Sequence, residues 1–373
     1  MAGSPGRREK DAVIVGEEGI KRKVGSMNAE VRMRRSSQMK MKNMKAGVVG
    51  AGLMGNVHAD SLASVEGISL KWVVDKHESR GKSLAEKYGA TWTKDVNPLL
   101  KDSETQIVIH ALPTYHRLDY LGKYMDAGKH ILCEKPLARN LEEAQTILNT
   151  AKGYDKVFMT GHVVRYFWEY AQARDLIISG EIGTPGIARL SRCGGRPSSQ
   201  NKTDNWYLDF QRSGGVLLDL AIHDLDWLLW TFGPVRRCFA QMTDPKDNHS
   251  DYALAIIKFK SGVLAHVETS WTEAPGSFWS TFEVSGSGGI MEYDMRDAKT
   301  LALTHKTSSQ DAKAGTVIPE SPTFESPYMT EMKHFVECIQ KGKKPLTGVK
   351  EAFEAARLAL DLIESAQTGM PVG

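Results

Sequence analysis

The stretch of sequence that most constrains the fold is 45–75, KAGVVGAGLMGNVHADSLASVEGISLKWVVD. It begins with a short apolar run at 46–49, and the glycine-rich segment GAGLMG follows at once. A helix-like segment at 56–65 comes next, and a second apolar run at 70–74 ends in Asp75. This order of strand, glycine turn, helix, strand and acid predicts a βαβ unit.

The glycines and the acid of this unit have separate physical roles in holding a dinucleotide. Gly50 permits a tight turn, Gly52 lets the backbone approach a pyrophosphate because it lacks a Cβ, and Gly55 lets the helix pack against the strand. The pyrophosphate then sits on unpaired N–H groups at the helix start. Asp75, 20 residues after Gly55, is placed to accept hydrogen bonds from ribose hydroxyls. The predicted cofactor-binding residues here are Gly50, Gly52, Leu53, Met54, Gly55 and Asp75. The alternative is a glycine-rich turn that binds nothing.

Length and composition favour two domains of an ordinary globular protein. The chain has 373 residues, which is more than one core usually spans. Its 4 cysteines are far apart and include no CxxC pair, which argues against a disulfide framework or a metal site and fits a reducing cytosol. No apolar run reaches the roughly 18 residues that span a membrane. We therefore expect a cytoplasmic protein with no membrane partner.

The first 44 residues stand apart because of their basic charge. Residues 1–45 hold 12 Lys and Arg against 5 Asp and Glu. Such a leader could be a nucleic-acid arm or an organelle address, but it has no aromatic residue for base stacking. Several methionines lie within it, so the true start could be one of them. We expect 1–44 to be a disordered leader or a mis-assigned start, with no nucleic-acid partner.

Beyond Asp75, short apolar strands alternate with helices. We expect strands at 106–111, 130–133 and 157–160, and helices at 79–88, 95–100, 120–127 and 141–152. This alternation is typical of a parallel, doubly wound sheet, whose ligands bind beyond the carboxyl ends of the strands. The residues that fall at those ends are Pro113, Thr114, Glu134 and Lys135. We predict that they share one crevice with the glycine turn.

The alternation ends near Gly161, and strands then follow one another with tight turns. We expect strands at 187–191, 235–241, 253–260, 262–271, 281–285 and 289–294, and helices at 166–179, 216–232, 327–341 and 350–368. The turns at 260–262 and 285–289 fit hairpins, and consecutive strands of this kind form an antiparallel-rich sheet. The predicted fold class is α/β. It has a Rossmann dinucleotide-binding domain at 45–163 and an α+β domain for substrate binding and oligomerisation at 164–373, built on a large, mostly antiparallel open sheet.

Lys135 is the first candidate for chemistry, in the segment Glu134-Lys135-Pro136. It follows a predicted strand and so lies close to the cofactor by topology. An ammonium beside a substrate hydroxyl favours the alkoxide that develops as hydride leaves. The alternative is a surface lysine on a loop.

Asp219 and His223 form the second candidate, in the run SGGVLLDLAIHDLD at 213–226. Their i, i+4 spacing puts both on one face of the predicted helix. An aspartate held near a histidine would raise the pKa of the imidazole and fix its orientation, as in a general base for a hydroxyl proton. A zinc half-site would need a third ligand that is missing at metal spacing. A buried structural pair is the other alternative.

Two further segments could contact the substrate. Arg165, in the segment GHVVRYFW at 161–168, offers a fixed fork of N–H donors. Trp206 and Tyr207, in a polar loop, could stack on a sugar face or merely cap the domain. We predict Arg165 and Trp206 as substrate-binding residues beside Asp219 and His223.

Over residues 45–369 the chain resembles the glucose-fructose oxidoreductase / inositol dehydrogenase / MocA family. The resemblance rests on GAGLMG, EKP at 134–136 and SGGVLLDLAIHDLD. It implies a Rossmann domain, a second domain on a large, mostly antiparallel sheet, a nicotinamide cofactor and a cyclic polyol or sugar-like substrate. The family often has a third glycine where this chain has Ser213.

The resemblance also implies roles for individual residues. Lys135, Asp219 and His223 match the family's catalytic set, with His223 as the proton acceptor and the other two orienting the hydroxyl. His116 matches a cofactor-side position. The Lys135–Pro136 bond is a candidate for a cis peptide.

We therefore predict an NAD(P)-dependent dehydrogenase acting on a secondary alcohol of an inositol or sugar-like polyol. NAD is preferred to NADP because Asp75 would repel a 2′-phosphate, although Lys76, His77 and Arg80 stand nearby and could weaken that repulsion. The same fold hosts NAD-retaining glycosidases and non-catalytic sugar- or cofactor-sensing regulators, which remain alternatives. The family further implies a homodimer or homotetramer through the C-terminal sheet.

Overall fold

The computed structural model describes residues 43–197, 205–243, 251–297 and 325–373. The basic leader expected at 1–44 lies outside the described residues except for its last two. Met44 is already the first residue of a strand, and Met44–Gly373 form one compact unit.

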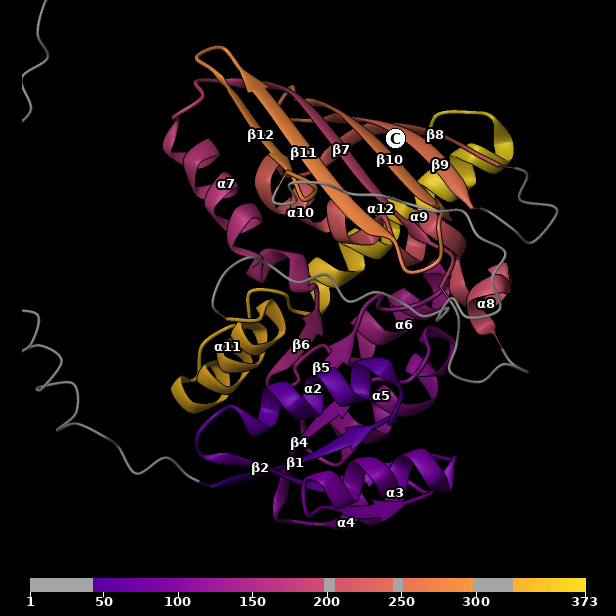
Figure 1. The fold of residues 1–373 in the computed structure, drawn as a ribbon, viewed down its shortest axis with the longest axis vertical. Helices are drawn as coiled ribbons and strands as arrows, with labels where there is room; N and C mark the ends of the chain where they lie inside the picture. The colour runs from indigo at the N-terminus through magenta and orange to yellow at the C-terminus, as the bar shows by residue number, and fades with distance from the viewer. Residues whose placement is uncertain (1–42, 198–204, 244–250, 298–324) are drawn as a thin grey trace, which may run out of the picture. The chain divides into compact units, whose positions relative to one another are not determined.

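The first sheet has six parallel strands in the order β3-β2-β1-β4-β5-β6 (Figure 1). The strands are β1 (Met44–Val49), β2 (Ile68–Val74), β3 (Thr91–Thr93), β4 (Thr105–His110), β5 (His130–Glu134) and β6 (Phe158–Gly161). This is the strand order of a dinucleotide-binding sheet, so the predicted doubly wound parallel sheet is confirmed. Strand β3 was not predicted, because its three residues contain no apolar run.

Helices cover both faces of this sheet, which explains its continuous apolar strands. They are α2 (Leu53–Ala63), α3 (Glu78–Lys87), α4 (Asn97–Lys101), α5 (Arg117–Asp126) and α6 (Leu141–Thr150), with a 3₁₀ turn η1 at Thr114–His116. Neighbouring strand residues enter different cores. Val48 packs with the residues of α2 and α3, whereas Val49 packs with those of α5 and α6.

The second sheet is mixed and mostly antiparallel, in the order β12-β11-β7-β10-β9-β8. Its strands are β7 (Pro185–Gly195), β8 (Val235–Met242), β9 (Tyr252–Phe259), β10 (Leu264–Glu273), β11 (Phe278–Gly286) and β12 (Ile290–Asp294). The predicted open antiparallel-rich sheet is confirmed, and the pair β7–β10 is its parallel member. The predicted turns at 260–262 and 285–289 join antiparallel hairpins.

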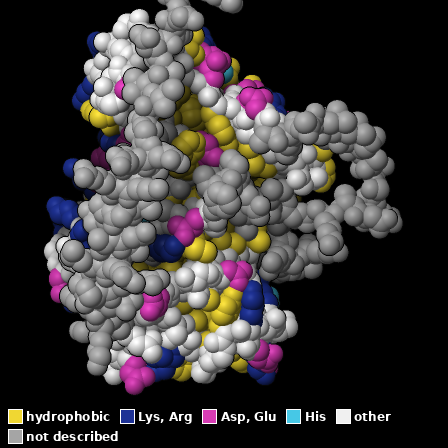
Figure 2. All heavy atoms as spheres, turned by 60° about the vertical axis from the view of Figure 1, so that its left-hand side comes forward, with side chains coloured by type: hydrophobic (Ala, Val, Ile, Leu, Met, Phe, Trp, Pro, Cys, Tyr) yellow, Lys and Arg dark blue, Asp and Glu magenta, His cyan; other side chains and the backbone are white. Residues whose placement is uncertain are grey.

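Helices lie against one face of the second sheet (Figure 1). They include α7 (Trp168–Ser179), α9 (Gly215–Asp219) and α10 (Ile222–Phe232), and the 3₁₀ turns η2 (Val163–Tyr166) and η3 (Trp206–Leu208) and the short helix α8 (Phe210–Ser213) stand beside them. Strand β9 shows that one face of the second sheet is buried and the other is exposed. Ala255 and Ile257 are buried, whereas Ile256 between them is 47% exposed. On the face shown in Figure 2, Lys and Arg side chains are interspersed with Asp and Glu among the described residues.

The last two helices pack on both domains. Met332 and Phe335 of α11 (Pro327–Lys341) enter the core that contains α2. Helix α12 (Val349–Thr368) places Phe353 against the parallel sheet and Leu362 in the core of the second sheet. The last strand of the parallel sheet ends at Gly161, two residues before the boundary predicted at residue 163, and α11 and α12 later return to that sheet.

The helix predicted at 216–232 is broken, and this prediction was wrong. Helix α9 ends at Asp219, and α10 begins at Ile222. The amides of Leu220 and Ala221 both donate to the carbonyl of Val216, at 3.0 and 2.8 Å. Two donors on one acceptor interrupt the regular pattern of helical hydrogen bonds, so one helix ends and the next begins at Ile222.

Candidate active site

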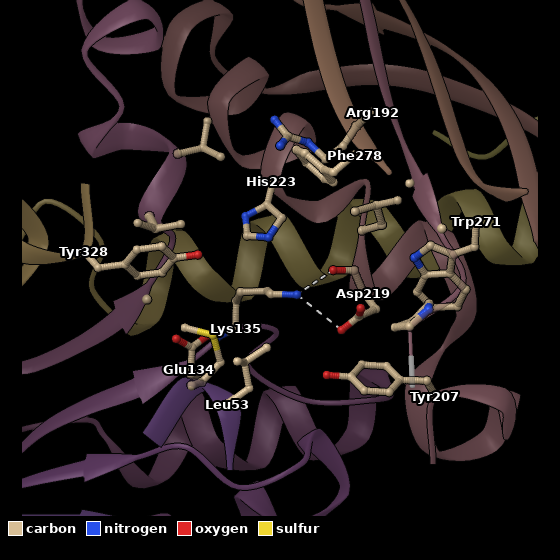
Figure 3. Close-up of a pocket in the computed structure, with 18 of the residues that line it drawn as sticks. Leu53, Glu134, Lys135, Arg192, Tyr207, Asp219, His223, Trp271, Phe278 and Tyr328 are labelled. Carbon is tan, nitrogen blue, oxygen red and sulfur yellow. Dashed lines mark hydrogen bonds and ion pairs between the residues drawn. The ribbon is translucent and has the colours of Figure 1, made fainter. Parts of the chain in front are cut away.

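A pocket lies where the carboxyl end of the parallel sheet meets the helices of the second domain (Figure 3). The first domain contributes Leu53, Met54, Glu134 and Lys135, and the second contributes Arg192, Tyr207, Asp219, His223, Trp271 and Phe278. Tyr328 of α11 completes one side. The structure therefore brings together Lys135, Asp219 and His223, which are far apart in the sequence.

Lys135 extends across the pocket toward Asp219 (Figure 3). Its Nζ donates to the Asp219 carbonyl at 2.6 Å and lies 3.2 Å from Asp219 Oδ1. The predicted cis bond between Lys135 and Pro136 is present. The ion pair is mostly shielded from water, so it holds the ammonium in one position.

Arg117, which is not among the predicted site residues, fixes the loop that carries Lys135. Its guanidinium is buried and donates to the carbonyl of Glu134 at 3.1 Å and to that of Lys135 at 3.1 Å. It also donates to the carbonyl of Leu112. One side chain on α5 thus ties together the loops after β4 and β5. No sequence motif marks this role.

His223 lies beside Lys135 near the start of α10 (Figure 3). Burial holds the pKa of His223 well below its ordinary value of 6.5, and the positive charges of Lys135 and Arg192 lower it further. The expectation that Asp219 raises this pKa was wrong. The helix break separates the two residues, and the Asp219 carboxylate faces Lys135 instead. The imidazole is consequently neutral at neutral pH, the form in which it can accept a proton.

Arg192 is a pocket residue that sequence reasoning missed, and Asp224 is its buried partner. The guanidinium of Arg192, from β7, lines the pocket and donates to both carboxylate oxygens of Asp224 at 2.8 and 2.7 Å. Its Nη2 also donates to the hydroxyl of Tyr170 at 3.1 Å. Asp224 directly follows His223, which is the one signal that could have pointed to the pair.

Arg165 is not at the pocket, contrary to the predicted substrate contact. Its side chain is buried, and its Nε and Nη2 each donate to Asp226 at 2.7 Å. The remaining Nη1 donates to the carbonyl of Leu346 at 2.9 Å. These partners occupy the fork of donors, so Arg165 joins α10 to the C-terminal segment. From the same stretch, Val163 and Val164 line the pocket instead.

Tyr207 lines the pocket where Trp206 was predicted to do so. The Trp206 ring stacks on the Tyr207 ring, with centroids 4.1 Å apart. Tyr207 in turn meets Trp271 edge-to-face at 6.4 Å. Trp206 therefore supports the pocket wall and does not form it.

The glycine turn fits a dinucleotide pyrophosphate. Gly50 has a φ of 99°, and a Cβ there would approach the Ala111 carbonyl oxygen to 2.8 Å. A Cβ on Gly55 would lie 1.8 Å from the Gly50 oxygen, whereas one on Gly52 would meet nothing within 4 Å. No side chain caps the start of α2 at Gly52. Open space beside an uncapped helix N-terminus suits an anionic group.

Asp75 stands directly after β2, where a ribose acceptor was expected. Its carboxylate accepts hydrogen bonds from the amides of Ala51 at 2.7 Å and His77 at 2.8 Å. Arg80 Nε also donates to Asp75 Oδ2 at 2.8 Å. The carboxylate is thereby fixed at the glycine turn, with a cation next to it.

The loop after β4 carries the other predicted cofactor contacts. Pro113 precedes η1, Thr114 is buried, and His116 Nδ1 lies 3.3 Å from Asp119 Oδ2. The Tyr115 hydroxyl accepts a hydrogen bond from Arg212 at 2.5 Å, which links this loop to α8. The residues that line the pocket do not include the three predicted residues of this loop, Pro113, Thr114 and His116.

Three further observations concern the described parts of the chain. All four cysteines are free and buried. Within the ranges given above, no three His, Cys, Asp or Glu side chains are grouped so as to hold a metal ion. None of the helices in those ranges has the length and apolar character to cross a membrane.

Comparison with known protein families agrees with the domain architecture. Residues 44–162 match the family described as an oxidoreductase family with an NAD-binding Rossmann fold. Residues 170–292 match the GFO/IDH/MocA C-terminal domain. The predicted family, its oxidoreductase character and its NAD cofactor are thereby confirmed.

Individual relatives and solved structures cover most of the chain. Scyllo-inositol 2-dehydrogenase (NAD(+)) of Bacillus subtilis is 29% identical over 346 residues, which cover 88% of this chain and 96% of the relative. Myo-inositol 2-dehydrogenase of Thermotoga maritima is 28% identical, covering 81% and 90%. The structure of GenD2 from gentamicin A biosynthesis, in complex with NAD, is 25% identical with a TM-score of 0.78, covering 89% and 96%. The chain belongs to the GFO/IDH/MocA family of NAD-binding oxidoreductases.

Proposed function

We propose that the protein is an NAD-dependent dehydrogenase that oxidises a secondary hydroxyl of an inositol or sugar-like polyol to a ketone, or catalyses the reverse reaction. The observation that carries the proposal is the shared pocket of Lys135 and His223. An ammonium from one domain and an imidazole from the other face the same space. A hydroxyl bound there meets both a cation and a base.

Each side chain has a distinct role in this reaction. The NAD cofactor, held at Gly50, Gly52, Gly55 and Asp75, supplies the hydride acceptor when bound. His223 accepts the hydroxyl proton on its neutral imidazole. Lys135 Nζ donates to the substrate oxygen and stabilises its developing negative charge. Asp219 holds that ammonium in place through the 3.2 Å contact.

The pocket wall suits a ring-shaped polyol. Tyr207, Trp271 and Phe278 offer aromatic faces, while Arg192 and Asp219 offer polar groups. Such a mixture of apolar wall and few polar groups can orient a hydroxylated ring. The two curated relatives named above act on inositols according to their names, which supports an inositol as the first substrate to test.

The cofactor preference and the assembly complete the proposal. The buried Asp75 carboxylate disfavours the 2′-phosphate of NADP, and Pro113, Thr114, His116 and Glu134 are proposed to contact the cofactor. The exposed face of the second sheet carries Ile187, Ile256 and Leu264, each more than 40% exposed. We propose that this face forms a homodimer or homotetramer of a cytoplasmic enzyme.

Two other functions compete with this proposal. An NAD-retaining glycosidase would hydrolyse a glycoside without net reduction of NAD. A sugar-sensing regulator would bind without turnover, but it would not need Lys135, Asp219 and His223 in one pocket. A panel of inositols, aldoses and glycosides, offered with NAD and followed by the ultraviolet absorbance of reduced nicotinamide, separates the three. We expect reduction of NAD with an inositol or sugar. Hydrolysis of a glycoside without NADH accumulation, or binding alone, would contradict the proposal.

A further inference from the structure

A buried cluster of ionisable side chains lies directly behind Lys135. It consists of His58 from α2, Glu134 at the end of β5 and Glu331 from α11. His58 and Glu331 are 0% exposed and Glu134 is 7% exposed. Buried charges are costly unless they are paired and hydrogen-bonded, so this arrangement requires an explanation. The reaction proposed above gives His58 and Glu331 no role.

A chain of contacts connects His58 to Lys135. His58 Nε2 lies 2.6 Å from Glu134 Oε1. The other carboxylate oxygen, Oε2, accepts the backbone N–H of Lys135 at 3.1 Å. The two oxygens of Glu134 therefore have separate partners. If the contact between His58 and Glu134 is lost, the Glu134 carboxylate is free to rotate away from the backbone N–H of Lys135.

The groups around Glu134 come from several elements. His58 faces it from α2, Arg117 donates to its backbone from α5, and Lys135 follows it in the chain. Glu331 approaches from α11, and the negative charge of Glu134 helps to raise the pKa of Glu331. Burial by itself would raise the pKa of Glu134, but the hydrogen bond and charge of His58, together with the charges of Lys135 and Arg117, outweigh it and lower that pKa.

Tyr328 connects this cluster to the pocket. Its ring meets the His58 ring edge-to-face at 6.4 Å, and Tyr328 lines the pocket beside Lys135 (Figure 3). The His58 ring therefore has Glu134 against one nitrogen and an aromatic ring packed against it. This packing leaves the imidazole little freedom to rotate.

We propose that His58 is a positioning residue for hydride transfer, which holds the Glu134 carboxylate so that it anchors the backbone of Lys135 beneath the substrate. The inference rests on the proposed function, because it concerns the placement of the Lys135 ammonium. His58 does not touch the substrate. It acts through Glu134, in the way that outer groups orient the residues that carry out chemistry.

The variants His58→Leu and His58→Gln test this inference in the full-length protein. Leucine removes the hydrogen bond, whereas glutamine retains an N–H donor on a side chain of similar reach. We expect His58→Leu to lower kcat about tenfold to a hundredfold, with a smaller change in the KM for the alcohol. Glutamine should restore most of the rate. Ser61→Ala, on the same helix and also buried, serves as the packing control and should leave kcat unchanged.

The pH profile distinguishes positioning from a merely structural role. Without His58, the hydrogen bond and charge that most strongly oppose the effect of burial are lost, so the pKa of Glu134 moves upward. The acidic limb of kcat/KM should therefore move to higher pH in His58→Leu and not in His58→Gln. A variant that melts earlier but keeps its kcat and pH profile would overturn the inference.

Two further variants keep the test decisive. If His58→Leu does not fold, Glu134→Gln weakens the same His58–Glu134 contact from its other side, because it removes the carboxylate charge, and it should give a similar loss of kcat. In the Glu134→Gln background, His58→Gln should add little, because both changes act on one interaction. Lys135→Ala separates the two proposals. If Lys135→Ala is inactive and the His58 variants are normal, only the positioning role fails, whereas an active Lys135→Ala refutes the proposed function itself.

Discussion

Lys135 Nζ lies 3.2 Å from Asp219 Oδ1, although 84 residues separate the two in the sequence. This contact joins the end of the parallel sheet to the broken helix of the second domain. It places the ammonium in the same pocket as His223.

Substitution of Asp219 tests whether its carboxylate holds the Lys135 ammonium in position for the reaction. In Asp219→Asn the side chain keeps its shape but loses the charge that faces Lys135 Nζ. We expect kcat to fall about a hundredfold, with a smaller change in the KM for NAD, because the contacts of Asp219 are with the Lys135 ammonium. Steady-state kinetics with NAD and the best alcohol check this. An unchanged kcat would show that the ion pair is not used in the reaction.

The pH dependence of the reaction tests the state of His223. Burial and the nearby charges of Lys135 and Arg192 hold the pKa of His223 well below its ordinary value of 6.5. The base is therefore already neutral near pH 6.5, and the activity should fall only at lower pH. Measurement of kcat/KM against pH for alcohol oxidation checks this. An acidic limb at or above 6.5 that disappears in His223→Gln would contradict the lowered pKa.

Arg165 should matter for stability because its buried guanidinium neutralises Asp226. Arg165→Ala leaves the Asp226 carboxylate buried and unpaired, which should cost about 3–5 kcal/mol in the free energy of unfolding. Arg174→Ala is the matched control, since Arg174 packs on the same Trp230 ring but is partly exposed. We expect a much smaller loss there, measured by urea denaturation. Equal losses in the two variants would contradict the importance of the buried pair.

The choice of cofactor depends on Asp75 and its neighbour Arg80. In Asp75→Ser the carboxylate that disfavours a 2′-phosphate is gone, and the Arg80 guanidinium is released to bind that phosphate. The ratio of kcat/KM for NADP to that for NAD should rise at least about tenfold. Adding Arg80→Ala should remove most of this gain. If the ratio of kcat/KM for NADP to that for NAD is the same in Asp75→Ser as in the unmodified protein, Asp75 does not set the cofactor preference.

Glu331 gives stability a pH dependence of its own. Its pKa lies well above the ordinary 4.5 because of burial and the charge of Glu134. Above pH 4.5 the unfolded chain releases this proton while the folded protein keeps it, so the free energy of unfolding falls as pH rises toward the raised pKa. In Glu331→Gln, which has no ionisable group at this position, this fall in the free energy of unfolding is absent. Its stability relative to the unmodified protein should therefore increase with pH, as measured by urea denaturation across the acid and neutral range.

Glu337, on the same helix, provides a control of opposite sign. Hydrogen bonds and charges from Lys341 and Lys343 lower its pKa to about 2. The contribution of Glu337 to the free energy of unfolding is present above pH 4.5, and it is lost as the pH falls from there toward the lowered pKa. Glu337→Gln should thus be slightly less stable at neutral pH, with the difference vanishing in acid. A Glu331→Gln variant with the same pH trend as Glu337→Gln would contradict the raised pKa.

The features predicted correctly are those with local signals. The dinucleotide turn was recognised from GAGLMG, the helix after it and Asp75, because each of these glycines and the acid is required for a steric or electrostatic reason within one βαβ unit. Apolar runs revealed the longer strands, and the hairpin turns at 260–262 and 285–289 fixed the antiparallel pairs. Strand β3 lacks such a run, and it is held by its pairing with β2 rather than by its own sequence.

The features that were missed depend on contacts between distant residues. Arg165 and Asp226 are 61 residues apart, and Arg192 and Asp224 are 32 apart. Nothing in the sequence shows which arginine faces the pocket and which is neutralised in the core. The helix predicted at 216–232 has apolar spacing throughout, so periodicity could not reveal the break at Leu220. That break, in turn, decides that Asp219 faces Lys135 rather than His223.

The most direct measurement is a crystal structure of the protein with NAD and an inositol or sugar substrate bound. We expect one substrate hydroxyl oxygen within about 3 Å of both Lys135 Nζ and the His223 ring, with the carbon that bears it against the nicotinamide. A nicotinamide bound away from this pocket, or a substrate that contacts neither Lys135 nor His223, would contradict this expectation.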